Sequence, residues 1–161
     1  MTGPEGATLL EPGDGSLGPL LRVTDDRLPP GAGYGVHAHR AVDVVAVVLS
    51  GSVTHRWGAG AVVGAGDVGV LRAGTGLEHD EVAGPDGARV LQCHLRPAGT
   101  VAAPAHEVVR APRGWVDLGR ADARLWIGED GADVPDGVVL RQGGGVVVVW
   151  RVDATRPDWA R

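Results

Sequence analysis

The chain has 161 residues, of which 43% are hydrophobic and 22% charged, and its formal net charge is −5. This length predicts one domain, or one domain with a short appendage, and this composition argues against a disordered chain. Because its basic residues form no cluster and its longest apolar run is short, the sequence predicts neither a nucleic-acid partner nor a membrane span.

The amino-acid usage predicts an all-β fold. Valine dominates the apolar residues, phenylalanine is absent, and the chain contains 27 glycines and 11 prolines. Valine packs well on a pleated sheet, whereas glycine and proline favour turns. Residues 1–15 lack the charged and apolar regions of a secretory signal, so we predict a soluble, cytoplasmic protein. In chain order, the sequence predicts a loosely held lead-in over 1–19 with one short strand, and then strands at 20–24, 41–49, 52–57, 61–63, 68–72, 77–82 and 89–95, with a loop at 25–35.

The second part of the chain predicts fewer strands. Residues 1–98 form the first unit of the predicted organisation, 99–113 a linker, and 114–161 a shorter β segment. Strands are expected there at 115–118, 123–127, 138–140 and 146–152. So few strands leave apolar faces and sheet edges that need cover. We expect that cover from a homodimer, or from this segment folding back over the first unit.

Two short patterns carry the chemistry of the chain. His37 and His39 are two residues apart, and His79 and Glu81 repeat that spacing about 40 residues later. In an extended strand, residues two apart point to the same face. Three imidazoles and one carboxylate on two facing strands could hold a divalent metal ion and leave room for water or substrate.

These patterns sit within longer motifs. The stretch 33–43 reads GYGVHAHRAVD, and the stretch 66–81 reads GDVGVLRAGTGLEHDE. Together they resemble the two motifs of the cupins, and over about residues 20–97 the sequence is similar to the pirin family. The resemblance implies a cupin fold, a jelly-roll barrel built as a double-stranded β-helix, with His37, His39, His79 and Glu81 as ligands of one metal ion, usually iron. Pirin-family proteins include quercetin 2,3-dioxygenases and transcriptional co-regulators.

The chain departs from the family in three ways. Ala38 stands where proline is usual between the first two histidines, and Asp43 stands where glutamate is usual. Pirins have two barrels, and the segment 122–129 (DARLWIGE) is similar to the start of the second. The residues after it are too few to close a barrel, so we predict an incomplete second cupin-like segment.

The remaining histidines are predicted to have lesser roles. His55 lies in an alternating strand rich in Ser and Thr and is expected to face solvent. His94 follows Cys93 on a predicted core strand, where we expect it to be a core histidine with one hydrogen bond, and a role in the pocket stays open. His106 falls in the predicted linker and is given no role.

Four further residues near the motifs have predicted positions. Asp43 has two open interpretations, as a partner of a ligand imidazole or of Arg40. Glu78 should point away from the site because it alternates with His79, so it is excluded as a ligand. Tyr34 is expected at the mouth of the pocket. Cys93 is expected to be a buried thiol.

The first functional hypothesis is a metal-dependent dioxygenase of the quercetinase type, acting with O2 on a small enolisable or phenolic substrate. Glu81 would assist deprotonation of that substrate. Fe(II) is the first expectation for the ion, although Ni, Mn, Co and Zn also suit these ligands. Two alternatives stay open: a metal-binding regulatory or accessory protein without turnover, and a small biosynthetic isomerase, cyclase or lyase.

Overall fold

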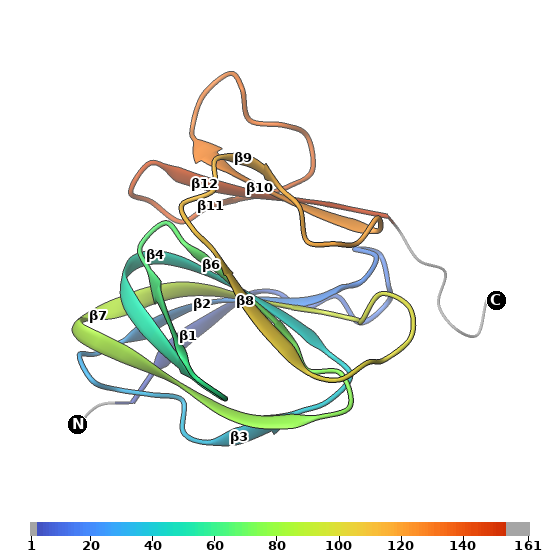
Figure 1. Ribbon diagram of the computed structural model, residues 1–161. Coiled ribbons are helices and arrows are strands. Elements are labelled where there is room, and N and C mark those ends of the chain that lie inside the picture. The colour runs from blue at the N-terminus through green and yellow to red at the C-terminus, as the bar shows by residue number, and fades with distance from the viewer. Residues whose placement is uncertain (1–2, 154–161) are drawn as a thin grey trace.

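The computed structural model describes residues 3–153, and within them it contains strands, turns and loops only. No helix that could cross a membrane is found there. Two antiparallel sheets make up the fold, as Figure 1 shows, which confirms the all-β prediction. The large sheet contains β1 (Glu5–Leu10), β2 (Leu20–Leu28), β3 (His37–His39), β4 (Asp43–Arg56), β5 (Ala61–Gly64), β6 (Val68–Arg72), β7 (Leu77–Leu95) and β8 (Ala105–Val109). The small sheet contains β9 (Gly114–Val116), β10 (Ala123–Glu129), β11 (Val138–Arg141) and β12 (Val146–Val152).

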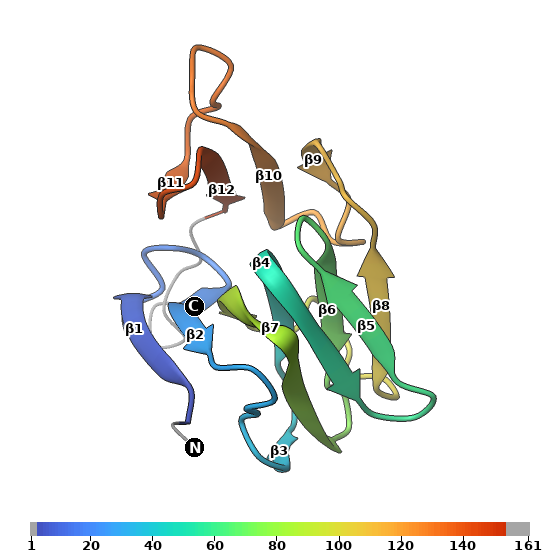
Figure 2. The same cartoon turned by 90° about the vertical axis from the view of Figure 1, so that its left-hand side faces the viewer.

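Two long strands, β4 and β7, organise the large sheet. Its main order is β1-β2-β7-β4-β6-β8, while β3 pairs with the first part of β7 and β5 with the last part of β4. The main order forms one part of the sheet, and β3 and β5 extend a second part. β4 and β7 run through both parts, and the sheet curls between them (Figure 2). The hollow of this curl holds the candidate site.

The curl depends on a bend shared by β4 and β7. Gly51 pairs with Ala88, but Val53 pairs with Ala83, so residues 84–87 of β7 lie opposite the single residue Ser52 of β4. Gly51 has a φ of 69°, and a Cβ atom there would collide with the carbonyl oxygen of Gly87. Only glycine fits such a close approach of two backbones. Just before Gly51, Val48 pairs with Val90 but Ser50 pairs with Arg89, so β4 contains one extra residue there, and this insertion reverses which residues of β4 face inward.

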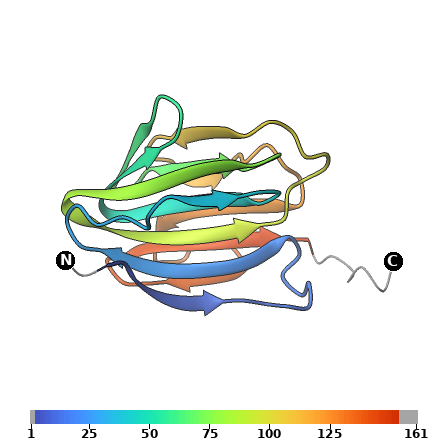
Figure 3. The ribbon, with the colours of Figure 1, turned by 90° about the horizontal axis from the view of Figure 1, so that it is seen from below.

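The small sheet packs on the outer face of the large one, opposite the hollow. Its four strands lie above the large sheet in Figure 1, and in Figure 3, seen from below, they lie behind it. One continuous apolar core joins the two sheets, with Trp150 fully buried. Its buried members include Val23, Val45, Val47, Val68, Val70, Leu91, Cys93 and Leu95 from the large sheet and Leu125, Ile127, Leu140 and Val148 from the small one. The C-terminal segment thus folds back over the first unit. This is one of the two ways in which its apolar faces and sheet edges were predicted to be covered.

Several predicted boundaries differ from the structure. The predicted linker contains β8, which pairs with β6 from Val68↔Val109 to Arg72↔Ala105. The predicted loop at 25–35 begins with the end of β2, and the turn signals near residues 50 and 86 lie inside β4 and β7 as the bend described above. Residues 1–2 and 154–161, which belong to the two predicted end units, lie outside the described residues.

Candidate metal centre

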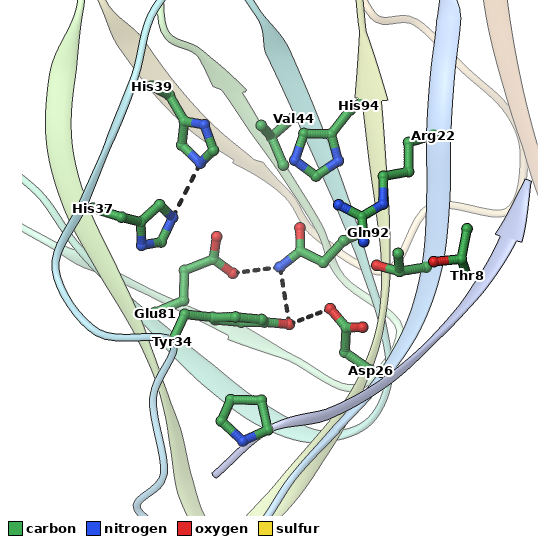
Figure 4. Close-up of a pocket in the computed structure, with 13 residues that line it drawn as sticks. Thr8, Arg22, Asp26, Tyr34, His37, His39, Val44, Glu81, Gln92 and His94 are labelled. Carbon is green, nitrogen blue, oxygen red and sulfur yellow. Dashed lines mark hydrogen bonds between the residues drawn. The ribbon is translucent and has the colours of Figure 1, made fainter. Parts of the chain in front are cut away.

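Three histidines converge where β3 meets β7. The register places His37 directly opposite His79, and His39 lies two residues further on the same face of β3. The Nε2 atom of His37 lies 3.1 Å from Nε2 of His39 and 3.0 Å from Nε2 of His79. One nitrogen from each ring lies within 4.8 Å of the other two, which makes the three a candidate metal-binding group. Figure 4 shows His37 and His39 facing each other.

The proton positions fit a cation at this point. His37 Nδ1 lies 2.7 Å from the carbonyl oxygen of Gly35, which can only accept a hydrogen bond, so Nδ1 carries the proton. In the neutral ring, Nε2 then presents a lone pair to both other histidines. Two nitrogens bound about 2.1 Å from one ion at right angles would lie about 3.0 Å apart, which is close to the distances found here. The residues present therefore fit a divalent metal.

The electrostatics also favour neutral imidazoles. Burial and the charges of the neighbouring histidines lower the pKa of His79 to about 3, and burial together with His37 lowers the pKa of His39. A ring whose pKa lies this far below neutrality keeps a nitrogen lone pair available at neutral pH. Neutral imidazole nitrogen is the form that binds a metal ion.

A second pair of histidines lies behind His79. His55 Nε2 is 2.8 Å from His79 Nδ1, and the His55 ring stacks on His106 with centroids 3.7 Å apart and planes 11° apart. If His79 presents the lone pair of Nε2 to an ion, its Nδ1 carries the proton and donates a hydrogen bond to His55 Nε2. His55 is 3% exposed, so the prediction that it faces solvent is wrong, and the assignment of no role to His106 overlooked this stack.

Glu81 lies beside the histidine cluster but outside the point where the three rings meet. Its Oε1 atom is 4.0 Å from His79 Nδ1, and its Oε2 atom accepts a hydrogen bond of 2.8 Å from Gln92 Nε2. In Figure 4 the oxygen that is not bonded to Gln92 points toward the space between the histidines and Gln92. Burial raises the pKa of this carboxyl, although the hydrogen bond from Gln92 opposes the rise.

A sequence model of the Pirin family matches residues 10–95, which is more than half of the chain and contains all four predicted ligands. The chain belongs to the pirin family. It is 30% identical to the pirin-like protein of Caulobacter vibrioides over 67% of this chain and 48% of that protein. It is also 36% identical to the quercetin 2,3-dioxygenase of Escherichia coli K12 over 38% of this chain and 28% of the enzyme. The aligned regions thus span about half or less of these relatives.

Solved structures of pirins share the fold. The bacterial pirin YhhW from Escherichia coli, solved in complex with nickel(II), superposes with a TM-score of 0.66 and 21% identity. The match covers 91% of this chain and 82% of YhhW. A quercetin 2,3-dioxygenase from Acinetobacter baumannii gives a TM-score of 0.56 at 20% identity, over 85% of this chain and 68% of the enzyme. These similarities confirm the predicted cupin fold.

A cavity of about 360 Å³ opens beside the histidines of this pirin-family chain. Its size is within the usual range for sites that bind small molecules. Side chains from five strands line it, together with Pro4 and Tyr34 from the connecting segments. The strand residues are Gly6, Thr8, Arg22, Thr24, Asp26, His37, His39, Val44, Glu81, Gln92 and His94.

A hydrogen-bond network forms one wall of the cavity (Figure 4). The Tyr34 hydroxyl donates to Asp26 Oδ2 at 2.6 Å, and Gln92 Nε2 reaches both Glu81 at 2.8 Å and the Tyr34 oxygen at 3.5 Å. Tyr34 was expected at the pocket, whereas Asp26 and Gln92 were not singled out. The signal available in the sequence was a polar residue, Gln92, two positions before His94 in an otherwise apolar strand.

The other residues considered from the sequence lie as follows. His94 lines the cavity, its ring centroid is 6.0 Å from that of His39, and its Nδ1 has no hydrogen-bond partner, so the expected single hydrogen bond is not found for that atom. Glu78 is exposed and points away from the site, as expected. Cys93 is buried between the sheets, also as expected.

Asp43 matches neither of its two interpretations. Its carboxylate accepts a hydrogen bond of 3.1 Å from Arg120, which also pairs with Asp122, instead of contacting a ligand imidazole or Arg40. Asp43 begins β4 in the large sheet, and Arg120 lies between β9 and β10 of the small sheet. The ion pair therefore links the two sheets and does not belong to the metal centre.

Proposed function

We propose that this chain holds one divalent metal ion with His37, His39 and His79, and that Glu81 is the fourth ligand. The convergence of three imidazole nitrogens is the observation that carries this proposal. The nickel(II) complex of the bacterial pirin YhhW supports it, because that protein has the same fold. Among ions that suit three nitrogens and one oxygen, we propose Fe(II) as the resident metal, with Ni, Mn, Co and Zn as substitutes.

We further propose that the metal centre serves a dioxygenase of the quercetinase type, acting with O2 on a small enolisable or phenolic substrate. The names of relatives such as the Escherichia coli quercetin 2,3-dioxygenase support this proposal. When bound, the metal would supply a Lewis acid and a template for the reactants. The cavity beside the histidines provides a space suited to a small organic substrate.

The side chains around the cavity would prepare the substrate. Gln92 holds one oxygen of Glu81 and leaves the other facing the cavity, where it can bind the ion or accept the proton of a substrate hydroxyl. Because burial raises the pKa of Glu81, its carboxylate is a stronger base than an exposed one. The proposed base thus has a fixed position and an open oxygen.

Elemental analysis of protein purified without chelator tests the metal site. We expect about one metal ion per chain in the wild type, and less than about a tenth of that in His37→Ala, because three ligands are the minimum for a stable site. Glu81→Ala should bind metal more weakly. Glu78→Ala is the matched control, because Glu78 lies on the same strand and faces solvent. Equal metal content in wild type and His37→Ala would contradict the proposal.

Oxygen uptake tests the activity separately. The metal-loaded wild type is expected to consume O2 with a flavonol or a catechol-like substrate, and Glu81→Gln to lose most of that rate because it cannot accept the proton. A fully metal-loaded protein that consumes no O2 with any such substrate would overturn the dioxygenase proposal. That result would favour the alternative of a metal-binding accessory protein.

A further inference from the structure

The inner face of the large sheet is unusually polar along β1, β2 and β7. Strand register places Arg22 opposite His94 and Thr24 opposite Gln92, with Thr8 of β1 opposite Thr24 on its other side. All five residues line the cavity. Side chains normally fill the interior of a small barrel, and polar groups are costly to bury there without partners. Packing alone therefore does not explain this polar wall.

Gln92 offers the cavity an unused hydrogen-bond acceptor. Its Nε2 group is occupied by Glu81 and Tyr34, while its Oε1 atom is buried and has no partner among the described residues. The residue as a whole is only 5% exposed. Leaving a buried acceptor unpaired costs free energy, so such an atom in a cavity wall indicates a ligand that donates a hydrogen bond.

Arg22 offers the same wall a positive charge without a carboxylate partner. Among the arginines of residues 3–153, Arg22 is the one that lines the cavity; it is exposed, and no ion pair is found for it. Figure 4 shows its guanidinium group near Gln92 and His94, on the opposite side of the cavity from His37 and His39. His94 Nδ1 is a further buried polar atom there without a partner.

We propose that the cavity binds a small hydroxy acid. Its carboxylate would accept hydrogen bonds from Arg22, and its hydroxyl would donate to the open oxygen of Gln92. The acid would lie with its carboxylate away from Glu81, whose negative charge lies at the histidine side of the cavity. This inference rests on the proposed function, and it narrows the enolisable or phenolic substrate to an anionic one.

Calorimetric titration with 3-hydroxybenzoate, 3-hydroxybenzamide and benzoate tests the inference. These probes separate the carboxylate from the hydroxyl, and the 3-hydroxy arrangement cannot chelate a metal through both groups. The wild type as purified should bind 3-hydroxybenzoate about tenfold more tightly than the neutral amide, and several-fold more tightly than benzoate. In Arg22→Gln, the preference for the acid over the amide should fall to about one.

Arg27→Gln is the matched control, because Arg27 lies on the same strand but does not line the cavity, and it should keep the wild-type preference. Equal affinity for acid and amide in the wild type, an unchanged preference in Arg22→Gln, or no binding of any probe at its solubility limit would each overturn the inference. Titration requires no turnover, so its result is independent of the oxygen-uptake assay. A preserved acid preference without O2 uptake would overturn the dioxygenase proposal alone.

Discussion

The two faces of the large sheet are built from the same strands but have opposite chemistry. Along β7, Leu91 and Cys93 point outward into the core beneath the small sheet, while Gln92 and His94 point inward to the cavity. Strand alternation makes this division possible, because successive side chains point to opposite faces. The outer face is stabilised by apolar burial, whereas the part of the inner face that lines the cavity is held by hydrogen bonds. A separate apolar cluster that includes Val48, Val53 and Val90 fills the rest of the inner face.

This contrast shows that stability and ligand binding can be changed separately, even by neighbouring residues. A substitution in the outer core should lower the free energy of unfolding and leave the affinity of the folded protein for metal unchanged. A substitution of a residue that lines the cavity should weaken binding of the metal and leave the free energy of unfolding nearly unchanged. The following variants test that separation.

The largest effect is expected from Trp150→Ala. Trp150 is fully buried in the core between the sheets, and removing such a side chain usually costs about 3–5 kcal/mol. Urea denaturation should show this loss, while the folded fraction keeps its affinity for nickel. Trp115→Ala is the control in the same sheet. Trp115 is half-buried beneath Arg124 and Arg151, so its removal should lower the free energy of unfolding by less. Equal losses in the two variants would contradict the assignment of the core.

His55→Asn should have the next largest effect, and it acts on the inner face. Loss of the hydrogen bond that orients His79 should weaken nickel binding about 10–100-fold. A competition titration with a chelator measures that affinity. His106→Asn is the control, because His106 contacts His55 through its ring face only and should change the affinity less. An unchanged affinity in His55→Asn would show that this hydrogen bond does not support the site.

The smallest of the three effects is expected from Asp25→Asn, and it depends on pH. Asp25 accepts two hydrogen bonds from Arg89 and one from Gln142, and the bond with Arg89 is the main reason that its pKa is lowered. A carboxyl with a lowered folded pKa contributes stability above its ordinary pKa of 3.8, and this contribution is lost as pH falls through the folded pKa.

At pH 7 the variant should therefore be less stable than the wild type by about 1 kcal/mol, and the difference should shrink below about pH 4. Urea denaturation across this pH range measures the difference. Asp86→Asn, at the exposed bend of β7, should stay within about 0.5 kcal/mol of the wild type throughout. A difference that does not depend on pH would exclude the charge of Asp25 as its cause.

Local patterns predicted much of the fold and the pairing of residues within each motif. The valine-rich strands between glycine turns indicated an all-β chain, and the alternation within 37–39 placed both histidines on one face. His55 was assigned to the wrong face for a physical reason. The extra residue of β4 between Val48 and Ser50 reverses the alternation, so that Val53 and His55 face inward with Val44 and Val48.

Features that depend on distant pairing could not be predicted from local sequence. β8 is a short strand within a segment rich in alanine and proline, and it forms because β6 offers it a sheet edge. The polar wall of the cavity likewise appears only when β2 pairs with β7, which brings Thr24 next to Gln92. Neither Asp43 nor Arg120 carries a signal that would show that they meet across the two sheets.

The single cysteine provides a natural probe of how the two sheets separate. Burial raises the pKa of Cys93 to about 12, so in the closed protein it is neither ionised nor accessible to a thiol reagent. A thiol reagent can modify Cys93 only when β12 separates from β7. The rate of alkylation at Cys93 would therefore report the frequency of that opening directly, without a label or any change to the sequence.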